Sequence, residues 1–284
     1  MLKLFGKRIR LFRPRSIWIR KIVQLAFFIL IALIAVNHSL TERGSPIPFV
    51  TNASLHAVCP FGGVVTFYQF ITTGALVQKI HQSSLVLMGI VFLTAILFGP
   101  VFCGWVCPLG TVQEWVSSFG RKKFKRRFNH FVPVKLDRWL RYLRYGVLAW
   151  VIYMTAVTGK LIFSEYDPYF SLFNFWNSDA TVIGLSILGV TLVLSFFVER
   201  PWCKYACPYG ALLGITNLFR VFSIRRNCET CKADGACSIL CPMNIPVDQV
   251  KVVRDHQCIS CLECTSEAIC PVHDTVKFST RGAK

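Results

Sequence analysis

The stretch FCGWVCPLG at residues 102–110 returns in altered form as WCKYACPYG at residues 202–210. Both copies follow the pattern C-x-x-x-C-P-x-G, and equivalent positions are separated by 100 residues. Each copy carries two thiols; the four cysteines are Cys103, Cys107, Cys203 and Cys207. The repetition indicates two related structural units, each of which ends in a pair of thiols.

The composition indicates a membrane protein with a modest soluble part. Hydrophobic residues make up 54% of the 284 residues, charged residues make up only 16%, and the mean hydropathy is +0.49. A net charge of +18 would favour a nucleic-acid partner if it were spread over a soluble domain, but the basic residues fall in blocks beside apolar runs. We therefore expect contact with membrane lipid and no nucleic-acid partner.

Four apolar stretches are long enough to cross a bilayer, which takes roughly 20 helical residues. They lie near residues 17–36, 83–102, 145–163 and 180–198. The first follows a basic N-terminus, residues 1–16, and we interpret it as a retained helix because the apolar run of a signal peptide is only about 7–15 residues long. The stretch 60–80 is only moderately apolar, and we interpret it as an interfacial or re-entrant segment.

The distribution of Lys and Arg predicts the orientation. These residues gather in the N-terminus, in the loop 104–141 and in the tail after residue 199, whereas the segments 37–82 and 164–179 hold only two between them. Basic loops stay on the cytoplasmic side. We therefore expect a multi-pass protein of the prokaryotic cytoplasmic membrane, with four spans and both termini in the cytoplasm.

The repeat predicts where the four thiols of the C-x-x-x-C-P copies lie. Each half reads as an outgoing helix, an aromatic loop, an incoming helix and then the cysteine motif. Repeats related by an axis along the membrane normal bring equivalent ends together. A cubane cluster needs four ligands, so we predict one shared redox site at the inner membrane face. The alternatives are thiols packed at two helix breaks, or a disulfide relay, which the reducing cytosol disfavours.

The tail carries the densest cysteine pattern. CETCKADGACSILCP at residues 228–242 and CISCLECTSEAICP at residues 258–271 each hold four cysteines. Two consecutive runs of this kind resemble the bacterial two-cluster ferredoxin, in which thiolates hold cubane [4Fe-4S] clusters. The alternative is a pair of zinc sites with four thiolates each. The trailing Cys-Pro steps, the close spacing and the membrane anchor favour clusters.

The ferredoxin resemblance implies a cross-ligated pairing, because the cysteine before proline serves the other cluster in that family. One cluster is then held by Cys228, Cys231, Cys237 and Cys270. The second is held by Cys258, Cys261, Cys264 and Cys241. Each run contains one gap of five residues, so both loops carry a small insertion that leaves the pairing open to a different outcome.

In its motif order the chain resembles the NapH-type membrane ferredoxin family over roughly residues 80–275, with related layouts in NosR regulators and cytochrome-oxidase accessory ferredoxins. Motifs and resemblance together predict a mainly α fold. A four-transmembrane-helix bundle of two repeated helix pairs (residues 17–221) precedes a C-terminal two-cluster ferredoxin-like α+β domain (residues 222–284). The resemblance implies electron transfer between membrane quinol, such as menaquinol, and a redox partner protein.

Two classes of function stay open. The first is an electron-transfer protein that takes electrons from the quinol pool or a cytoplasmic donor, as a quinol dehydrogenase subunit does. The second is a cluster-bearing assembly or redox-regulatory factor for another metalloenzyme. A substrate-converting enzyme is disfavoured, because the chain has no nucleotide-binding glycine fingerprint and no Ser/His/Asp set, and its carboxylates are scattered.

Other residues are candidates on chemical grounds, but we favour a structural role for each. Cys59, the thirteenth cysteine, lies on the predicted outer side, where a packed thiol is the simpler interpretation. Outer-face groups able to accept quinol protons are more simply solvated or capping; they are His56, His81, Glu42, Glu165 and Asp167. The aromatic run YFSLFNFW, which ends at Trp176, fits an interfacial belt at least as well as a quinone pocket. The basic run RKKFKRRF at residues 121–128 fits anionic lipid, with an acidic partner as the alternative.

Overall fold

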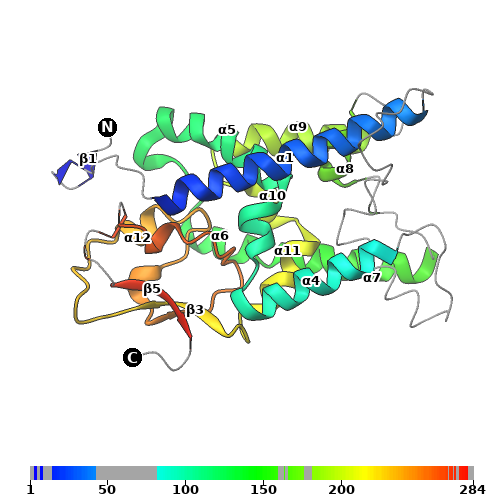
Figure 1. The fold of residues 1–284 in the computed structure, drawn as a ribbon. Helices are drawn as coiled ribbons and strands as arrows, with labels where there is room; N and C mark the ends of the chain where they lie inside the picture. The colour runs from blue at the N-terminus through cyan, green and yellow to red at the C-terminus, as the bar shows by residue number, and fades with distance from the viewer. Residues whose placement is uncertain are drawn as a thin grey trace.

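The computed structural model describes residues 3–4, 7–8, 15–42, 82–158, 163, 166–175, 181–267, 269–270, 272 and 275–280. The predicted re-entrant segment lies outside these residues, as do the candidates Cys59, His56, His81, Glu165 and Trp176. Of Glu42, only its place at the end of a helix is described. In Figure 1 the long helices run side by side, and the cysteine-rich tail lies at one end of them.

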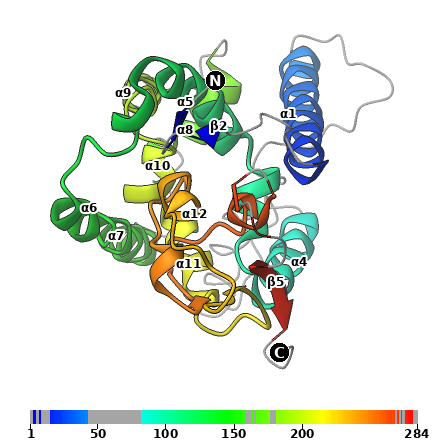
Figure 2. The same ribbon diagram turned by 90° about the vertical axis from the view of Figure 1, so that its left-hand side faces the viewer.

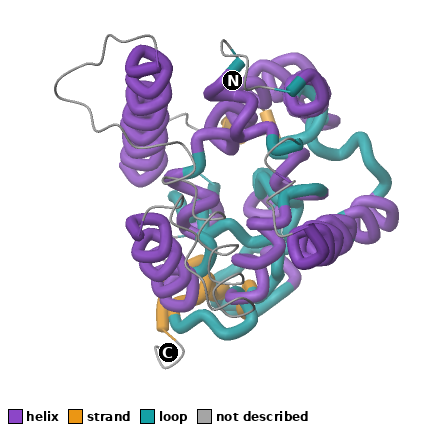
Figure 3. Tube along the Cα trace, turned by 90° about the vertical axis from the view of Figure 1, so that its right-hand side faces the viewer, coloured by secondary structure: helices purple, strands orange, loops and turns teal. Residues whose placement is uncertain are grey.

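Four helices lie where the apolar stretches predicted them: α1 (Arg15–Glu42), α4 (Gln82–Phe98), α7 (Leu143–Thr158) and α9 (Val182–Ser195). Figure 3, which looks from the end opposite the tail, shows helices close to end-on. Among the described residues, one helix is long and apolar enough to cross a membrane, over Ile17–Thr41. Two shorter apolar helices cover Val86–Phe98 and Val182–Ser195. The second predicted span extended to residue 102, but α4 ends at Phe98 because Gly99 adopts a φ of +83° and Pro100 follows.

The two cysteine motifs fold in the same way. In the first, the π-helix η1 (Phe102–Val106) leads into α5 (Pro108–Phe124); in the second, α10 (Pro201–Tyr205) leads into α11 (Pro208–Thr216). Cys107 and Cys207 are the extended residues between these helices, with ψ of 114° and 113°. In both copies the following proline occupies the first helical position, where a missing N–H costs nothing. The connection from α5 to α7 passes through η2 (Lys125–Arg127) and α6 (Val134–Leu140).

The segment 164–179, expected as an outward loop, contains a helix that packs into the bundle. Helix α8 (Pro168–Asn174) contacts α1, α5 and α9. Phe173 is buried in a cluster with Ile31 and Ala35, and its ring centroid lies 5.8 Å from that of Phe28. The aromatic run is apolar enough that burial against the bundle stabilises it.

The tail folds around a three-stranded antiparallel sheet. Strand β3 (Phe222–Arg226) lies between β4 (Val252–Val253) and β5 (Val276–Thr280), with Ile224 opposite both Val253 and Phe278. The short helix α12 (Ala236–Ile239) and the 3-10 turns η4 (Val247–Gln249) and η5 (Glu263–Thr265) complete it. A separate two-stranded hairpin, β1 (Lys3–Leu4) with β2 (Lys7–Arg8), precedes α1. Figure 2 shows the tail end facing the viewer. The tail is thus a small ferredoxin-type unit beside a helical bundle.

The tail docks directly on the first cysteine motif through close backbone contacts. A Cβ added at Gly104 would lie 2.4 Å from the Ile259 carbonyl oxygen, and one at Gly99 would lie 2.6 Å from Ser260 Oγ. The Trp105 indole N–H donates to the Ser260 carbonyl at 3.1 Å, and Ser260 Oγ donates to the Phe98 carbonyl at 2.8 Å. Only glycine at these positions allows the loop Cys258–Cys261 to approach so closely.

A buried ion-pair network also connects the first cysteine motif to α1 and to the tail. Arg20 of α1 pairs with Glu114 of α5 and, at 2.6 Å, with Glu263 of the tail. Arg200 is fully buried and pairs with the same Glu114 at 3.1 Å. Arg20 also donates to the Gly104 carbonyl at 3.0 Å. Burial disfavours the charge on Glu114, but Arg200 and Arg20 outweigh it and hold the pKa of Glu114 below its usual value.

We predict that Gly104→Ala weakens tail docking, because the new methyl group meets the Ile259 backbone. Overpacking of this kind costs about 1–3 kcal/mol, which lowers the unfolding temperature by roughly 2–4 °C per kcal/mol in a chain of this size class. Thermal unfolding in detergent and the rate of proteolytic release of the tail measure it. Gly89→Ala is the matched control, since an added Cβ there has nothing within 4 Å; equal behaviour of the two variants would contradict the packing argument.

We predict that Glu114→Gln destabilises the chain by about 3–5 kcal/mol at neutral pH, because it leaves the buried Arg200 without a carboxylate among the described residues and Arg20 with Glu263 alone. A carboxyl whose pKa is lowered on folding contributes stability above its unfolded pKa, and that contribution is lost as pH falls through the folded pKa. The difference in stability between wild type and variant should therefore shrink only under acid conditions, below pH about 4. Glu229→Gln changes an exposed carboxylate and should show neither effect.

Candidate functional site

The four thiols of the repeated motif lie together, at the ends of the helix pairs that the tail contacts. Burial raises the pKa of the Cys103 thiol, and the neighbouring thiols Cys107 and Cys203 raise it further. Burial raises the pKa of the Cys207 thiol as well, and the three other thiols of the motif add to this effect. The first turn of α11 points a backbone donor at sulfur: the Gly210 N–H lies 3.3 Å from Cys207 Sγ. This hydrogen bond lowers the pKa of the Cys207 thiol, but burial outweighs it and the pKa is raised overall.

A pocket opens beside these thiols and reaches α8. Cys107, Cys203 and Cys207 line it together with Asp167, and the remaining lining is mostly aromatic: Phe102, Phe163, Tyr169, Trp202 and Tyr209, with Leu109 and Pro208. Asp167 was expected as a solvated or capping residue on the outer side. It does cap α8, accepting the Tyr169 backbone N–H at 3.0 Å, but it is buried in this pocket. Burial raises the pKa of Asp167 to about 7, against the lowering effect of that hydrogen bond.

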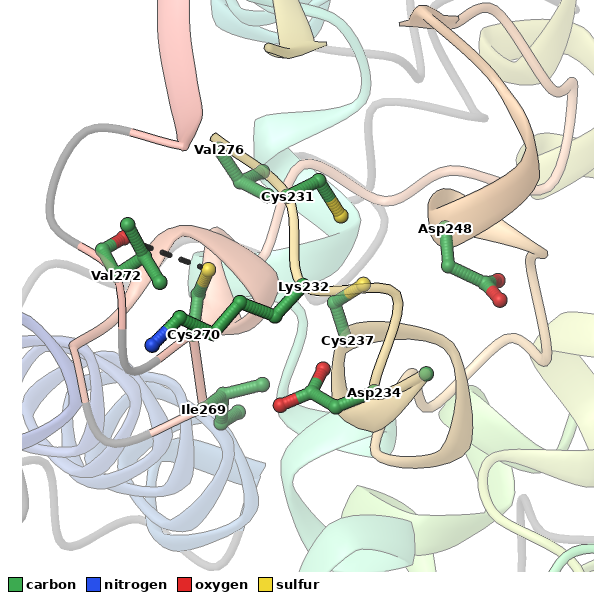
Figure 4. A pocket seen from close by; sticks show the side chains of 10 residues that line it. Cys231, Lys232, Asp234, Cys237, Asp248, Ile269, Cys270, Val272 and Val276 are labelled. Carbon is green, nitrogen blue, oxygen red and sulfur yellow. Dashed lines mark hydrogen bonds between the residues drawn. The ribbon is translucent and has the colours of Figure 1, made fainter. Parts of the chain in front are cut away.

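In the tail, cysteines from both runs line a second pocket. Figure 4 shows Cys231 and Cys237 of the first run facing the same space as Cys270 of the second. Cys270 Sγ lies 3.5 Å from the Val272 carbonyl, to which it donates. Cys228 is exposed and lies, with Cys231 and Cys237, within electrostatic reach of Arg226. Cys270 therefore shares this pocket with two cysteines of the first run.

Cys241 belongs to the first run in the sequence, but its neighbours in the structure include cysteines of the second run. Burial raises the pKa of the Cys264 thiol, and the neighbouring thiols Cys261, Cys241, Cys258 and Cys237 raise it further. Cys258 and Cys264 are buried, whereas Cys241 and Cys261 are partly buried. Cys241 thus lies near cysteines of the second run. Asn129 holds the turn that follows it by donating to the Pro242 carbonyl at 3.1 Å.

The second thiol group of the tail adjoins the thiols of the repeated motif. Cys103 and Cys261 both pack against the apolar core of the tail, whose buried members include Cys237, Cys258 and Cys264. The residue after Cys103 is Gly104, whose missing side chain leaves room for Ile259. The loop Cys258–Cys261 of the tail therefore lies against the first cysteine motif of the helix bundle.

Two buried arginines at this junction indicate that an anionic group belongs there. Arg144 and Arg220 are 2% and 1% exposed, and no carboxylate among the described residues lies within 4.0 Å of either guanidinium. Arg144 donates to the His256 carbonyl at 2.8 Å, and Arg220 Nη1 lies 3.6 Å from Cys258 Sγ. A buried uncompensated charge costs several kcal/mol. A cluster ligated by four thiolates carries the negative charge that these cations lack, so the residues present fit such a group.

The described residues contain no group of three or more His, Cys, Asp or Glu side chains arranged to hold a single metal ion. The ligands of a cubane stand farther apart than those of one ion, so this finding does not bear on the cluster sites.

Sequence reasoning located the thiols but missed the polar residues around them. Two carboxylates to which sequence reasoning assigned no role each pair with buried cations: Glu114 with Arg20 and Arg200, and Asp137 with Lys204 at 2.7 Å. Arg20 lies in the first apolar stretch, residues 17–36, and was likewise assigned no role of its own. The available signal was the placement of Arg200 and Lys204 on either side of Cys203, because a charge next to a buried motif needs a partner.

A family model described as a 4Fe-4S binding domain matches the chain twice, at residues 80–127 and 180–227. The two matches are offset by 100 residues, as the cysteine motifs are, and each contains one C-x-x-x-C-P copy. They support two [4Fe-4S] clusters. Both ranges end before Cys228, so they do not decide which cysteines hold those clusters.

Relatives align over most of the chain. The protein YccM of Escherichia coli, named for electron transport, is 31% identical over 94% of this chain and 76% of its own length. An uncharacterised protein of Methanocaldococcus jannaschii is 35% identical over 78% of this chain and 86% of its own. The ferredoxin-type protein NapH of Haemophilus influenzae is 31% identical over 74% of each. No solved structure matches. The chain therefore belongs to the NapH-type family of ferredoxin proteins.

Proposed function

We propose that the chain is a membrane-bound electron-transfer protein that carries electrons between quinol and a protein partner. The coarser part of this statement, iron–sulfur electron transfer in a ferredoxin-type protein, follows from the family. The observation that carries the finer part is the docking of the loop Cys258–Cys261 against Cys103 and Gly104. This contact makes a continuous path from the tail to the thiols of the helix bundle.

The proposed ligands follow from the thiol groups. Cys228, Cys231, Cys237 and Cys270 hold the distal cluster of the tail, and Cys241, Cys258, Cys261 and Cys264 hold the proximal one; lining and electrostatic proximity support this pairing. Cys103, Cys107, Cys203 and Cys207 hold a third, shared cluster. A [4Fe-4S] cluster exchanges single electrons with its neighbours. The chain's own part is to hold the three thiol groups in contact and away from water.

Exposed apolar faces support the proposed insertion in the membrane, and the placement of basic residues supports the proposed orientation. Large apolar side chains are exposed along all four long helices. Exposure of this much apolar surface is unfavourable in water but not in lipid. They include Ile22 and Leu33 on α1, Ile90 and Leu93 on α4, Ile152 and Val157 on α7, and Val190 and Val193 on α9. The basic end of α5 and the β1–β2 hairpin lie at the same end of the molecule as the tail (Figure 1). That end is the proposed cytoplasmic side.

The pocket at Asp167 supports quinol as the electron donor. Its aromatic lining suits a flat, apolar ring, and it borders three of the four bundle thiols. Quinol oxidation releases two protons along with two electrons, so a proton acceptor is needed near the ring. Asp167 is the carboxylate that lines the pocket, and we assign it that role at its side-chain oxygen.

We predict about twelve irons in the full-length protein, because each of three cubanes contains four. Cys203→Ser should remove about four of them and leave the signals of the two tail clusters intact. Iron analysis and electron paramagnetic resonance of the anaerobically purified chain measure both. Cys59→Ser, which changes the cysteine outside all three groups, is the matched control and should lose none. If wild type and Cys203→Ser both hold about eight irons, the third cluster is contradicted and the repeated motif has a structural role.

We predict that Asp167→Asn slows menaquinol-driven cluster reduction by roughly 100-fold, the lower end of what a positioned proton acceptor contributes. Asparagine still caps α8, so iron content and reduction by dithionite should stay at wild-type levels. Asp255→Asn is the control, since Asp255 accepts the same kind of backbone hydrogen bond, from Gln257 N–H at 2.8 Å, and is not among the residues that line the pocket. If menaquinol reduces no cluster even in the wild type, the alternative role as an assembly or regulatory factor takes precedence.

A further inference from the structure

Arg220 directs a buried positive charge at one group of tail cysteines. It is 1% exposed. Its Nη1 donates to Asn217 Oδ1 and Ser260 Oγ, both at 3.2 Å, and lies 3.6 Å from Cys258 Sγ, while Nη2 donates to the Val253 carbonyl. Nε is buried and has no acceptor among the described residues. The guanidinium is therefore fixed on several sides, and no carboxylate among the described residues neutralises it.

The other thiol group of the tail has a different cation. Arg226, at the end of β3, lies beside Cys231 but is only half-buried, and its Nε donates to the Val250 carbonyl at 3.2 Å. Water and salt screen an exposed charge far more than a buried one. The two thiol groups of the tail therefore differ in the effective positive charge that they feel.

Building on the proposed cluster assignment, we propose that Arg220 is a positioning residue that raises the reduction potential of the proximal cluster, the one held by Cys241, Cys258, Cys261 and Cys264. Reduction adds one electron, and hence one negative charge, to the cluster and its thiolates; no bond forms or breaks. A buried cation that donates to a ligand sulfur stabilises this added charge, and hydrogen bonds to sulfur are among the determinants of cluster potentials. Without Arg220 the proximal cluster would be harder to reduce.

The test is a redox titration of the full-length protein, followed by electron paramagnetic resonance, on wild type, Arg220→Gln and Arg220→Lys. Cys264→Ser, which removes a ligand of the proximal cluster, identifies its signal. We expect Arg220→Gln to lower the reduced-to-oxidised ratio of that cluster at least tenfold at a fixed potential, which is about 59 mV for a one-electron couple. Arg220→Lys keeps the charge but loses the fork of donors, so its shift should have the same sign and be smaller.

Arg226→Gln is the matched control, and it should move only the distal cluster, by less. A proximal potential unchanged in both Arg220 variants, with iron content intact, would overturn the inference while leaving the proposed function standing. Loss of the proximal cluster in both variants would make Arg220 purely structural and would overturn it as well. Wild-type protein that binds no iron would instead remove the proposed function itself.

Discussion

The junction between bundle and tail depends on the carboxylate of Glu114 and the two buried arginines that share it. Arg20 comes from α1 and Arg200 from the turn before α10, so one acidic side chain joins three parts of the chain. Arg20 continues to the tail through Glu263. A buried ion pair is weak support for stability compared with a packed apolar core. What it provides here is position: Arg20 and Arg200 also donate to the carbonyls of Gly104 and Cys103, and so fix the first cysteine motif.

The network also breaks the symmetry of the repeat. The motifs place four sulfur atoms in equivalent positions, but the residues around them differ: the counterpart of Glu114 is Gly214, and the counterpart of Gly104 is Lys204. Gly104 leaves room for the Ile259 backbone of the tail, whereas Lys204 is fully buried against Asp137. Two copies that were alike in every residue would offer the tail two equal docking sites. The differences let it dock in one orientation.

The sequence predicted the features that depend on spacing and period. The four helices, the small ferredoxin-type tail and the family all follow from apolar runs and cysteine patterns, which are local signals. The features that depend on long-range partners were not predictable in this way. Glu114 is separated from Arg20 by 94 residues and from Arg200 by 86, and nothing near Glu114 in the sequence indicates either partner. The packing of α8 was missed for the same reason, because an aromatic run fits an interface as well as a bundle interior until its neighbours are known.

The distribution of charge at the junction links folding to the proposed cofactor. Glu114 and Asp137 neutralise the cations nearest to them, but Arg144 and Arg220 have no carboxylate partner among the described residues, and both contact the segment 256–260. Unbalanced buried charges oppose docking by several kcal/mol. Under the proposed ligand assignment, the thiolates and cluster of that segment supply the missing negative charge. Docking of the tail and retention of the proximal cluster then stabilise each other, so the electron path across the junction is complete only when the group that carries the electron is in place.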